Sequence, residues 1–596
     1  MRKTKKYRLA IGLVIGILAS QTAGCGQSAD ISRTSAGSPA SAEQITAGPG
    51  ENENNGAGQV SETIGRDEQT DANGRITVTA VLGEGGEKTI SYEPEDLVSE
   101  WEEGAAVLIE LTGDGIVAKN ANVAVSGRTA VIKQGGIYVV SGQIEEGQLR
   151  IEAGKGEIVR LILNGVELSN GNTSPIYGAE KCKVVLTLAD GTTNIIRDGS
   201  EYRFETEGED EPDAPIFIKG DLTINGTGEL QVYGNYRSGI RSKDNLKVIS
   251  GRIAIEAMDD GLKGRDSVII RNGTLKIQAV KDGIKSNRDE DPKKGFIWID
   301  GGEISIAAKD DGIQAETALI VCGGNIQVTE SQEGLAGKTV DILGGVVKAV
   351  TEDDGINAAI SVDTEQEKME NQEGVYIRIA GGEIWLNAKA DGIDSNGDLY
   401  LEGGGLYLSG PVSRGDGIFD YNGKASITGG TVFAAGSSGM MQSFGEDSAS
   451  NYLVIHWEES QEAGSRVQLS DGSGSVLGEY APEKEFDTMI ISVPGMEEGN
   501  VYYVKAGEKE ENTIEITVTG RETVYGTSAG RGMGGHGPGG RGGGFGERRQ
   551  GSGAPPELPE GAERGAQREG RPELPEGEEP SNGRRSTPPS ESTSSS

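Results

Sequence analysis

The stretch Gly301-Gly302-Glu303-Ile304-Ser305-Ile306-Ala307-Ala308-Lys309-Asp310-Asp311-Gly312-Ile313 decides the fold of this chain. A glycine pair opens it, apolar and more polar side chains then alternate, and an Asp-Gly turn closes it. Alternation with a period of two is typical of a short strand that buries one face. The stretch therefore predicts one short strand held between two tight turns.

The closing turn recurs along the middle of the chain at intervals of about 22 residues. Two longer intervals contain hydrophilic insertions, Arg288 to Lys294 and Asp363 to Glu373. The glycine density and the period of two exclude a helical solenoid. The repeat predicts an all-β chain, a right-handed parallel β-helix with two or three strands per coil. Its turns are Ser238-Gly239-Ile240, Asp260-Gly261-Leu262, Asp282-Gly283-Ile284, Asp311-Gly312-Ile313, Glu333-Gly334-Leu335, Asp354-Gly355-Ile356, Asp391-Gly392-Ile393, Asp416-Gly417-Ile418 and Ser438-Gly439-Met440.

The composition of the 596-residue chain excludes several classes of function. It has 56 Lys and Arg against 94 Asp and Glu, a net charge of −38, which excludes binding of nucleic acid or anionic lipid by its own surface. Three cysteines exclude a disulfide scaffold. The two histidines, His456 and His536, are too few for a multi-histidine zinc or copper centre. Any metal is therefore expected to be a hard, oxygen-binding cation.

The N-terminus has the pattern of a targeting segment. A basic start and the apolar run from Leu9 to Ala19 precede Thr22-Ala23-Gly24-Cys25, which predicts a secretory signal over residues 1–24. The small residues before Cys25 resemble a bacterial lipobox, so Cys25 is expected to carry a lipid that anchors the protein to the extracellular face of a bacterial membrane. The alternative is a plain signal peptide with an incidental cysteine.

The rest of the chain divides by composition. Residues 25–75 lack large apolar side chains and are expected to form the lipidated residue and a disordered tether. The parallel β-helix is expected over 76–450, and a small β region or cap over 451–525. Residues 526–596 are rich in Gly, Arg and Pro and predict a disordered tail. An RNA-binding tail is the alternative, which the near-neutral charge of this segment and the secretory signal argue against.

Carboxylates at the Asp-Gly turns are expected to stack in a column. Coils of a β-helix lie about 4.8 Å apart, where unit charges repel by about 0.9 kcal/mol even in water. Calcium relieves such repulsion, because oxygens on adjacent coils can reach an ion between them. The alternative is ordinary turn chemistry, with each Asp bonded to its own backbone. Glu333 and Lys281 interrupt the column, and Lys281 is an expected internal counter-charge. The expected calcium ligands are Asp259, Asp260, Asp282, Asp310, Asp311, Asp353, Asp354, Asp391 and Asp416.

Aromatic side chains form a second expected ladder. Trp385, Tyr407 and Phe433 fall at matching outward positions of three successive coils, and Trp298, Arg378 and Tyr400 occupy outward positions on the other strand type. A row of exposed rings suits stacking on the apolar faces of sugars. The alternative is that a segment such as 451–525 covers these rings.

Several runs of sequence resemble a known family. They are Gly165-Val166-Glu167-Leu168-Ser169, Val184 to Asn194, Ile218 to Gly226 and Gly239-Ile240-Arg241-Ser242-Lys243-Asp244. Together they are similar to the bacterial surface carbohydrate-binding β-helix family of cellulolytic clostridia, over about Ile76 to Thr523. The resemblance implies a pectate-lyase-like fold, calcium at the Asp-rich turns, and binding of cellulose or acidic pectic polysaccharide. Lys281, Glu333 and Ala390 depart from the family pattern, which leaves the number of ions open.

Three functions follow as hypotheses. The first is a lipid-anchored, monomeric surface protein whose calcium-loaded β-helix binds polysaccharide, with no nucleic-acid partner. The second is a calcium-dependent polysaccharide lyase, for which Lys263, Lys281 and Lys285 beside the Asp column are the candidate bases. The third is a structural or adhesive envelope protein, in which the Asp column only stabilises the rod.

Overall fold

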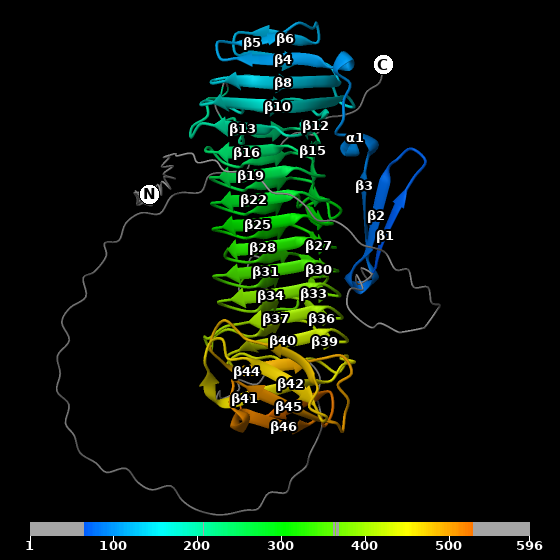
Figure 1. Ribbon diagram of the computed structural model, residues 1–596, viewed down its shortest axis with the longest axis vertical. Coiled ribbons are helices and arrows are strands. Elements are labelled where there is room, and N and C mark those ends of the chain that lie inside the picture. The colour runs from blue at the N-terminus through cyan, green and yellow to red at the C-terminus, as the bar shows by residue number, and fades with distance from the viewer. Residues whose placement is uncertain (1–64, 205, 207, 362–363, 365–368, 528–596) are drawn as a thin grey trace, which may run out of the picture.

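In the computed structural model, residues 65–527 are described apart from 205, 207, 362–363 and 365–368. They form a long rod of stacked coils, with a small sheet beside it and a β region at its C-terminal end (Figure 1). Each coil contributes three strands to three parallel sheets, so the predicted parallel β-helix is confirmed. Among these residues, no helix is long and apolar enough to cross a membrane.

Sheet 1 carries the longest strand of each coil. Every neighbouring pair in it is parallel, and the register is continuous except for one shift between β25 and β28 after Ile306. Its strands are β13 (Thr193–Asp198), β16 (Glu229–Gly234), β19 (Arg252–Ala257), β22 (Thr274–Ala279), β25 (Glu303–Ala308), β28 (Asn325–Glu330), β31 (Val346–Thr351), β34 (Glu383–Ala388), β37 (Gly405–Ser409) and β40 (Thr431–Gly436).

Sheet 2 lies next to sheet 1, around the corner made by the glycine pairs. At one such corner, Gly302 has a φ of +101°, which a residue with a Cβ rarely adopts. The strands of sheet 2 are β12 (Lys183–Leu188), β15 (Leu222–Gly226), β18 (Asn245–Val248), β21 (Ser267–Ile270), β24 (Phe296–Ile299), β27 (Ala318–Val321), β30 (Thr339–Ile342), β33 (Tyr376–Ile379), β36 (Asp398–Leu401) and β39 (Ala425–Ile427).

Sheet 3 lies between the Asp-Gly corner and sheet 2, and it is a 13-stranded sheet. In the sequence, both predicted insertions fall between a strand of sheet 3 and the next strand of sheet 2. The strands of sheet 3 are β6 (Val123–Ser126), β7 (Thr129–Ile132), β9 (Gln148–Ile151), β11 (Ile176–Gly178), β14 (Ile216–Ile218), β17 (Ile240–Ser242), β20 (Leu262–Gly264), β23 (Ile284–Ser286), β26 (Ile313–Ala315), β29 (Leu335–Gly337), β32 (Ile356–Ala358), β35 (Ile393–Ser395) and β38 (Phe419–Tyr421).

The coils begin later in the chain than the sequence predicts. The first strand stacked on the rod is β4 (Val107–Thr112), which pairs with β5 (Ile116–Ala118) and β8 (Gly136–Ile144). The long strand β10 (Ile158–Asn170) then bends across a corner, because its first half pairs with β12 and its second half with β13. Aliphatic side chains from all three sheets fill the interior in one continuous core.

The segment before the coils folds back along the rod. The strands β1 (Arg66–Thr70), β2 (Ile76–Val81) and β3 (Glu87–Tyr92) form an antiparallel sheet, followed by the short helix α1 (Pro94–Leu97). This N-terminal sheet stands beside sheet 2 in Figure 1. Val78, Ile90 and Tyr92 pack in one apolar cluster with Trp298 and Ile320 of sheet 2. The outer face of sheet 2 is therefore largely an internal surface.

The C-terminal end of the rod is closed by a second β region. The last long strand of the rod, β40, pairs antiparallel with β44, which in turn pairs with β41. A separate four-stranded sheet has the order β43-β42-β45-β46. The strands are β41 (Tyr452–Gln461), β42 (Val467–Asp471), β43 (Val476–Tyr480), β44 (Phe486–Ser492), β45 (Val501–Ala506), β46 (Thr513–Thr517) and β47 (Glu522–Tyr525).

Candidate functional site

The Asp-Gly corners run down the edge between sheet 1 and sheet 3. Glycine is needed there because the coils approach closely: a Cβ on Gly283 would lie 2.4 Å from Ile306 Cγ2 and 2.6 Å from the Gly312 carbonyl oxygen. The backbone ladder continues through the corner, since the Gly283 N–H donates to the Asp311 carbonyl at 2.9 Å. Successive acidic side chains are thereby held one coil apart.

Three corner carboxylates accept a backbone hydrogen bond from the next coil. Asp282 Oδ1 accepts the backbone N–H of Asp311 at 3.1 Å, and Asp354 Oδ1 accepts that of Asp391 at 2.9 Å. Asp391 Oδ1 accepts the N–H of Gly417 in the same way. Each of these carboxylates thus has a structural role through one oxygen, which leaves its second oxygen to meet a side chain or a ligand.

In the N-terminal half of the column, the acids are neutralised by neighbouring bases. Outward bases on the short strands of sheet 3 form ion pairs with nearby acids: Lys263 with Asp260 and Lys285 with Asp282 at the corners of their own coils, and Arg241 with Asp213 of the preceding coil. Lys281 Nζ lies 2.6 Å from Asp259 Oδ1, which confirms Lys281 as an internal counter-charge.

In the C-terminal half, the same outward positions carry no base. From β26 to β35 they are Gln314, Ala336, Asn357 and Asp394. Among the described residues, no Lys or Arg pairs with Asp311, Glu333, Asp354, Asp391 or Asp394. From the coil of Gln314 onwards, the acids of the column therefore have no basic partner in the described part of the chain, whereas those before it do.

Two groups of carboxylates come close enough to share a cation. Oxygens of Asp282, Asp310 and Asp311 lie within 4.8 Å of one another, and so do oxygens of Asp354, Asp391 and Asp394. Burial, followed by the charge of Glu333, raises the pKa of Asp311 to about 8. Burial, followed by the charges of Asp394 and Asp391, raises the pKa of Asp354 to about 9. The second group is the better candidate for a cation site, because in the first group Lys285 already neutralises the charge of Asp282.

The donor set of the second group fits a hard divalent cation. Three carboxylates supply only acceptor oxygens, which repel one another until a cation or protons intervene. Asn357, three residues beyond Asp354, donates its amide N–H to Glu333 at 2.6 Å, while its buried Oδ1 has no hydrogen-bond partner among the described residues. Carboxylate and amide oxygens without nitrogen or sulfur donors are the ligands that calcium prefers.

The other residues predicted as ligands fall in different places. Asp259 and Asp260 are held by lysines, whereas Asp353 and Asp416 lie outside both groups. The sequence did not predict Asp394 as a ligand, although its position is visible there. It is the third residue after the corner acid, the position that holds Lys263 and Lys285 in earlier coils, and here it is itself acidic.

The lysines considered as lyase bases are engaged in these ion pairs. Lys285 contacts both Asp282 and Gln314 Oε1. Burial lowers the pKa of Lys285, but the charge of Asp282 outweighs this effect and leaves the pKa raised. The hydrogen bond to Asp259 raises the pKa of Lys281. A general base needs the opposite shift, so this geometry favours a binding role for the column over proton abstraction.

The first predicted aromatic ladder forms, and the C-terminal region packs against it. Trp385 and Tyr407 stack with ring centroids 4.1 Å apart, and Phe433 follows at 6.2 Å. Tyr480 of the C-terminal region packs against both Trp385 and Tyr407, and Phe433 is 0% exposed. Phe433 is therefore unavailable to a sugar, whereas Trp385 and Tyr407 stay partly exposed. All three rings pack against the C-terminal region, as the alternative interpretation held.

The second aromatic set is covered by the N-terminal sheet. Trp298 is 0% exposed and donates its indole N–H to Asp300 at 2.8 Å. Arg378 is buried and bonds to Glu402, Asp341 and the Val81 carbonyl of β2. Tyr400 is half-buried and donates to Asp398 at 2.7 Å. Trp298 and Arg378 therefore hold structural contacts and do not face a ligand, because a covering segment far away in the sequence docks on them.

Trp385→Ala is expected to destabilise the protein by about 1–2 kcal/mol, the value of one lost stacking partner and part of its packing. Polysaccharide affinity is expected to stay unchanged, since this ring packs against Tyr407 and Tyr480 and serves to hold the C-terminal region. Chemical denaturation and a binding titration on the same variant check both statements. Val350→Ala, on the exposed face of the same sheet, is the control and should change stability by less than about 0.5 kcal/mol. A loss of affinity in Trp385→Ala would contradict the assignment.

Comparisons with known proteins bear on this site. A family model described as "Carbohydrate-binding domain-containing protein" matches residues 126–409 and 319–434. A carbohydrate-binding domain-containing protein of Acetivibrio thermocellus is 36% identical over 183 residues, which are 30% of this chain and 62% of that relative. This chain thus covers less than two thirds of the relative's length. A solved structure described as the polysaccharide lyase-like protein from C. thermocellum, gadolinium derivative, is 32% identical, with 44% of this chain and 97% of that chain covered and a TM-score of 0.37.

Proposed function

This chain belongs to the carbohydrate-binding domain-containing protein family, and we propose that it is a cell-surface lipoprotein that binds acidic polysaccharide through a calcium-loaded β-helix. One observation carries the calcium part of the proposal. Asp354, Asp391 and Asp394 bring oxygens within 4.8 Å of one another, and no base among the described residues neutralises them. The lipid anchor is supported by the sequence around Cys25, which lies outside the described residues.

The C-terminal half of the column offers room for a ligand beside the acids. A hollow of about 360 Å³ on the outer side of sheet 3 is lined by Gln314, Glu333, Asn357, Ser361 and Asn396, among others. Amide and hydroxyl side chains of this kind suit hydrogen bonding to sugar hydroxyls. Calcium bound at the neighbouring carboxylates would supply the positive charge that a uronate needs on an otherwise repulsive acidic edge.

Polygalacturonate is expected to bind the full chain in calcium and to bind at least about tenfold more weakly after chelation, because the acid column then repels the ligand. Isothermal titration with polygalacturonate, with calcium and with a chelator, measures this difference. Titration with an uncharged cellulosic polymer is the control for simple sugar stacking. Equal affinity in calcium and in chelator would refute the calcium contribution, and no binding of either polymer would refute the function.

A further inference from the structure

The outer face of sheet 1 carries a row of side chains that the proposed calcium site does not use. Strand register places one residue per coil in line along the rod, and we name this row the sheet 1 stripe. It has no acid in it, although the chain as a whole carries a net charge of −38. The stripe consists of Gln231, Ala254, Lys276, Ser305, Gln327 and Lys348.

The same row continues into the aromatic ladder of Trp385, Tyr407 and Phe433. Lys348 pairs in register with Trp385, which pairs with Tyr407 and then Phe433. The C-terminal region packs against those rings and buries Phe433 completely. The stripe is thus the open part of one long row, and it ends where the covered part begins.

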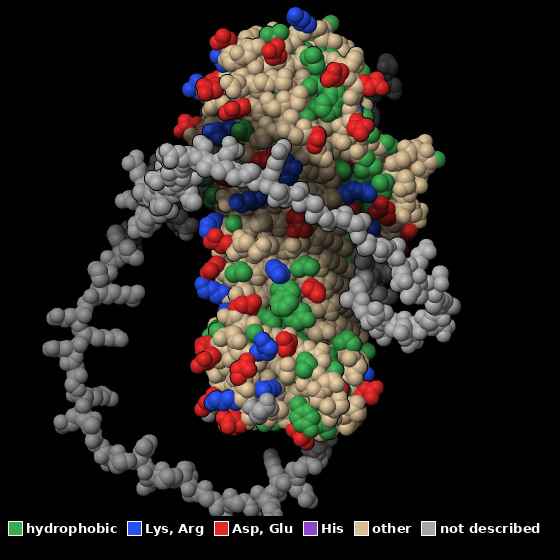
Figure 2. Space-filling view, viewed as in Figure 1, with side chains coloured by type: hydrophobic (Ala, Val, Ile, Leu, Met, Phe, Trp, Pro, Cys, Tyr) green, Lys and Arg blue, Asp and Glu red, His purple; other side chains and the backbone are tan. Residues whose placement is uncertain are grey.

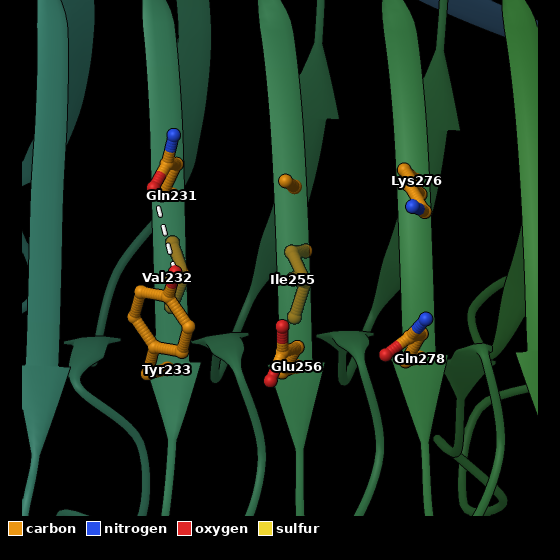
Figure 3. Close-up of a pocket in the computed structure, with 8 residues that line it drawn as sticks. Gln231, Val232, Tyr233, Ile255, Glu256, Lys276 and Gln278 are labelled. Carbon is orange, nitrogen blue, oxygen red and sulfur yellow. Dashed lines mark hydrogen bonds between the residues drawn. The ribbon is translucent and has the colours of Figure 1, made fainter. Parts of the chain in front are cut away.

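A shallow hollow of about 90 Å³ lies over the N-terminal part of the stripe. Figure 3 shows Gln231, Tyr233, Glu256, Lys276 and Gln278 lining it from three neighbouring strands, β16, β19 and β22. A second hollow of about 410 Å³ shares Glu256 and Gln278 with the first and extends towards the Asp-Gly corner. Together they make an elongated depression across the coils.

Tyr233 is the aromatic side chain of this depression. The guanidinium carbon of Arg197, on β13, lies 4.4 Å from the centroid of the Tyr233 ring. Tyr233 also donates its hydroxyl to Gln231 Oε1 at 3.4 Å, and Gln231 donates to Glu229 at 2.6 Å. These contacts hold a flat ring among amide and carboxylate groups, which suits stacking of a sugar with hydrogen bonds at its edge.

Three cations along this face have no acidic partner within the described residues. Arg197, Lys276 and Lys348 are exposed, and none of them forms an ion pair there. Lys276 and Lys348 lie three coils apart in the same row, about 14 Å at about 4.8 Å per coil. Figure 2 looks onto this side of the rod and shows Lys and Arg interspersed with Asp and Glu, in contrast to a continuous acidic surface.

We propose that the sheet 1 stripe is a second polysaccharide contact, where an extended uronate-bearing chain runs along the rod axis with carboxylates on Lys276 and Lys348 and one sugar ring on Tyr233. The inference rests on the proposed function, since it assumes that the protein binds polysaccharide. It adds a contact that needs no metal. Binding through the stripe is therefore separable from binding through calcium.

The test compares the full chain with Lys276→Gln/Lys348→Gln, using polygalacturonate in chelator at low ionic strength. The wild type is expected to keep a weak, salt-sensitive affinity, because exposed charge pairs are screened by salt. The double variant is expected to lose that residual affinity by on the order of tenfold, from two exposed ion pairs. Lys119→Gln/Lys133→Gln removes two exposed lysines at the N-terminal end of the rod and is the matched control, expected within twofold of the wild type.

The outcomes separate this inference from the proposed function. If the wild type binds polygalacturonate but the stripe variant binds equally well in chelator, the inference is wrong and the proposed function stands. The inference is equally wrong if the two control substitutions weaken binding as much as the stripe substitutions do. If the wild type binds no polysaccharide in calcium or in chelator, the proposed function itself fails. A stripe variant that also loses an uncharged polymer would overturn the assignment of uronate as the ligand.

Discussion

Asp96→Ala is expected to release the N-terminal sheet from the rod and to lower its stability by about 3–5 kcal/mol, the usual cost of removing one partner of a buried ion pair. Asp96 is 0% exposed. Its two oxygens lie 2.7 Å from Lys183 Nζ and 2.8 Å from Lys247 Nζ. The hydroxyl of Thr223 donates to it at 2.6 Å. Without the carboxylate, the two ammonium groups would lose their shared buried partner, and Lys183 would keep Glu95 while Lys247 would keep the Ser91 carbonyl.

Hydrogen exchange of residues 66–97 is the direct measurement, because the cluster that joins the N-terminal sheet to sheet 2 is separate from the interior core of the rod. The variant is expected to lose protection there while the coils from β13 onwards keep theirs. Asp67→Asn is the control, since Asp67 is exposed and its side chain accepts a hydrogen bond from Gln69, a neighbour on the same strand. Unchanged protection of residues 66–97 in the Asp96 variant would show that apolar packing alone holds the sheet.

The ion pairs of Asp96 with Lys183 and Lys247 also determine how the docking of the N-terminal sheet on the rod depends on pH. Burial raises the pKa of Asp96, but Lys247 and Lys183 outweigh it and leave the pKa below its ordinary value. A carboxyl with a lowered pKa contributes its full stability above the unfolded value of about 3.9 and loses it as the pH falls through the folded value. The N-terminal sheet is therefore expected to stay protected at neutral and mildly acidic pH and to detach only in stronger acid.

The periodic parts of this structure could be predicted from the sequence, and the covering segments could not. Alternation and the 22-residue spacing depend on contacts between neighbouring coils, which the sequence repeats many times. The docking of β1–β3 depends on single long-range contacts such as Arg66 with Asp300 and Tyr92 with Asp300. Nothing periodic marks such pairs. An outward Trp385 therefore looks the same in the sequence whether it faces solvent or Tyr480.

The candidate calcium site could be predicted from the sequence only in part. The corner acids are visible there, but the residue three positions after each acid decides whether its charge is already neutralised. That residue stands beside the acid on sheet 3, a proximity that only the coil geometry reveals. Lys263 and Lys285 neutralise their coils, while Asn357 and Asp394 do not. The column is thus one structural motif with two electrostatic outcomes.

The contrast between a lysine-paired corner acid and an unpaired one predicts opposite effects of Asp260→Asn and Asp354→Asn on the stability of the protein. In chelator, Asp354→Asn is expected to stabilise the protein by on the order of 2 kcal/mol, because it removes a buried acid that faces Asp391 and Asp394. The asparagine oxygen can still accept the Asp391 N–H. Asp260→Asn is expected to destabilise by about 3 kcal/mol, because Lys263 loses its buried partner.

Calcium is expected to make the wild type more stable than Asp354→Asn, the reverse of their order in chelator. Asp260→Asn is expected to stay less stable than the wild type by the same amount as in chelator. A ligand present at about 100 times its dissociation constant stabilises the native state by about 2.7 kcal/mol. The wild type should gain this amount, and Asp354→Asn should gain much less, since one of its three carboxylates is gone. Chemical denaturation of the three proteins in chelator and in calcium measures all six stabilities.

If Asp354→Asn were destabilising in chelator, the acids would be satisfied by contacts other than a cation. If Asp260→Asn lost the response to calcium, the metal would bind in the paired half of the column. The corner acids with a lysine three residues later would then behave like those without one. The distinction between a neutralised and an unneutralised half of the column would be wrong.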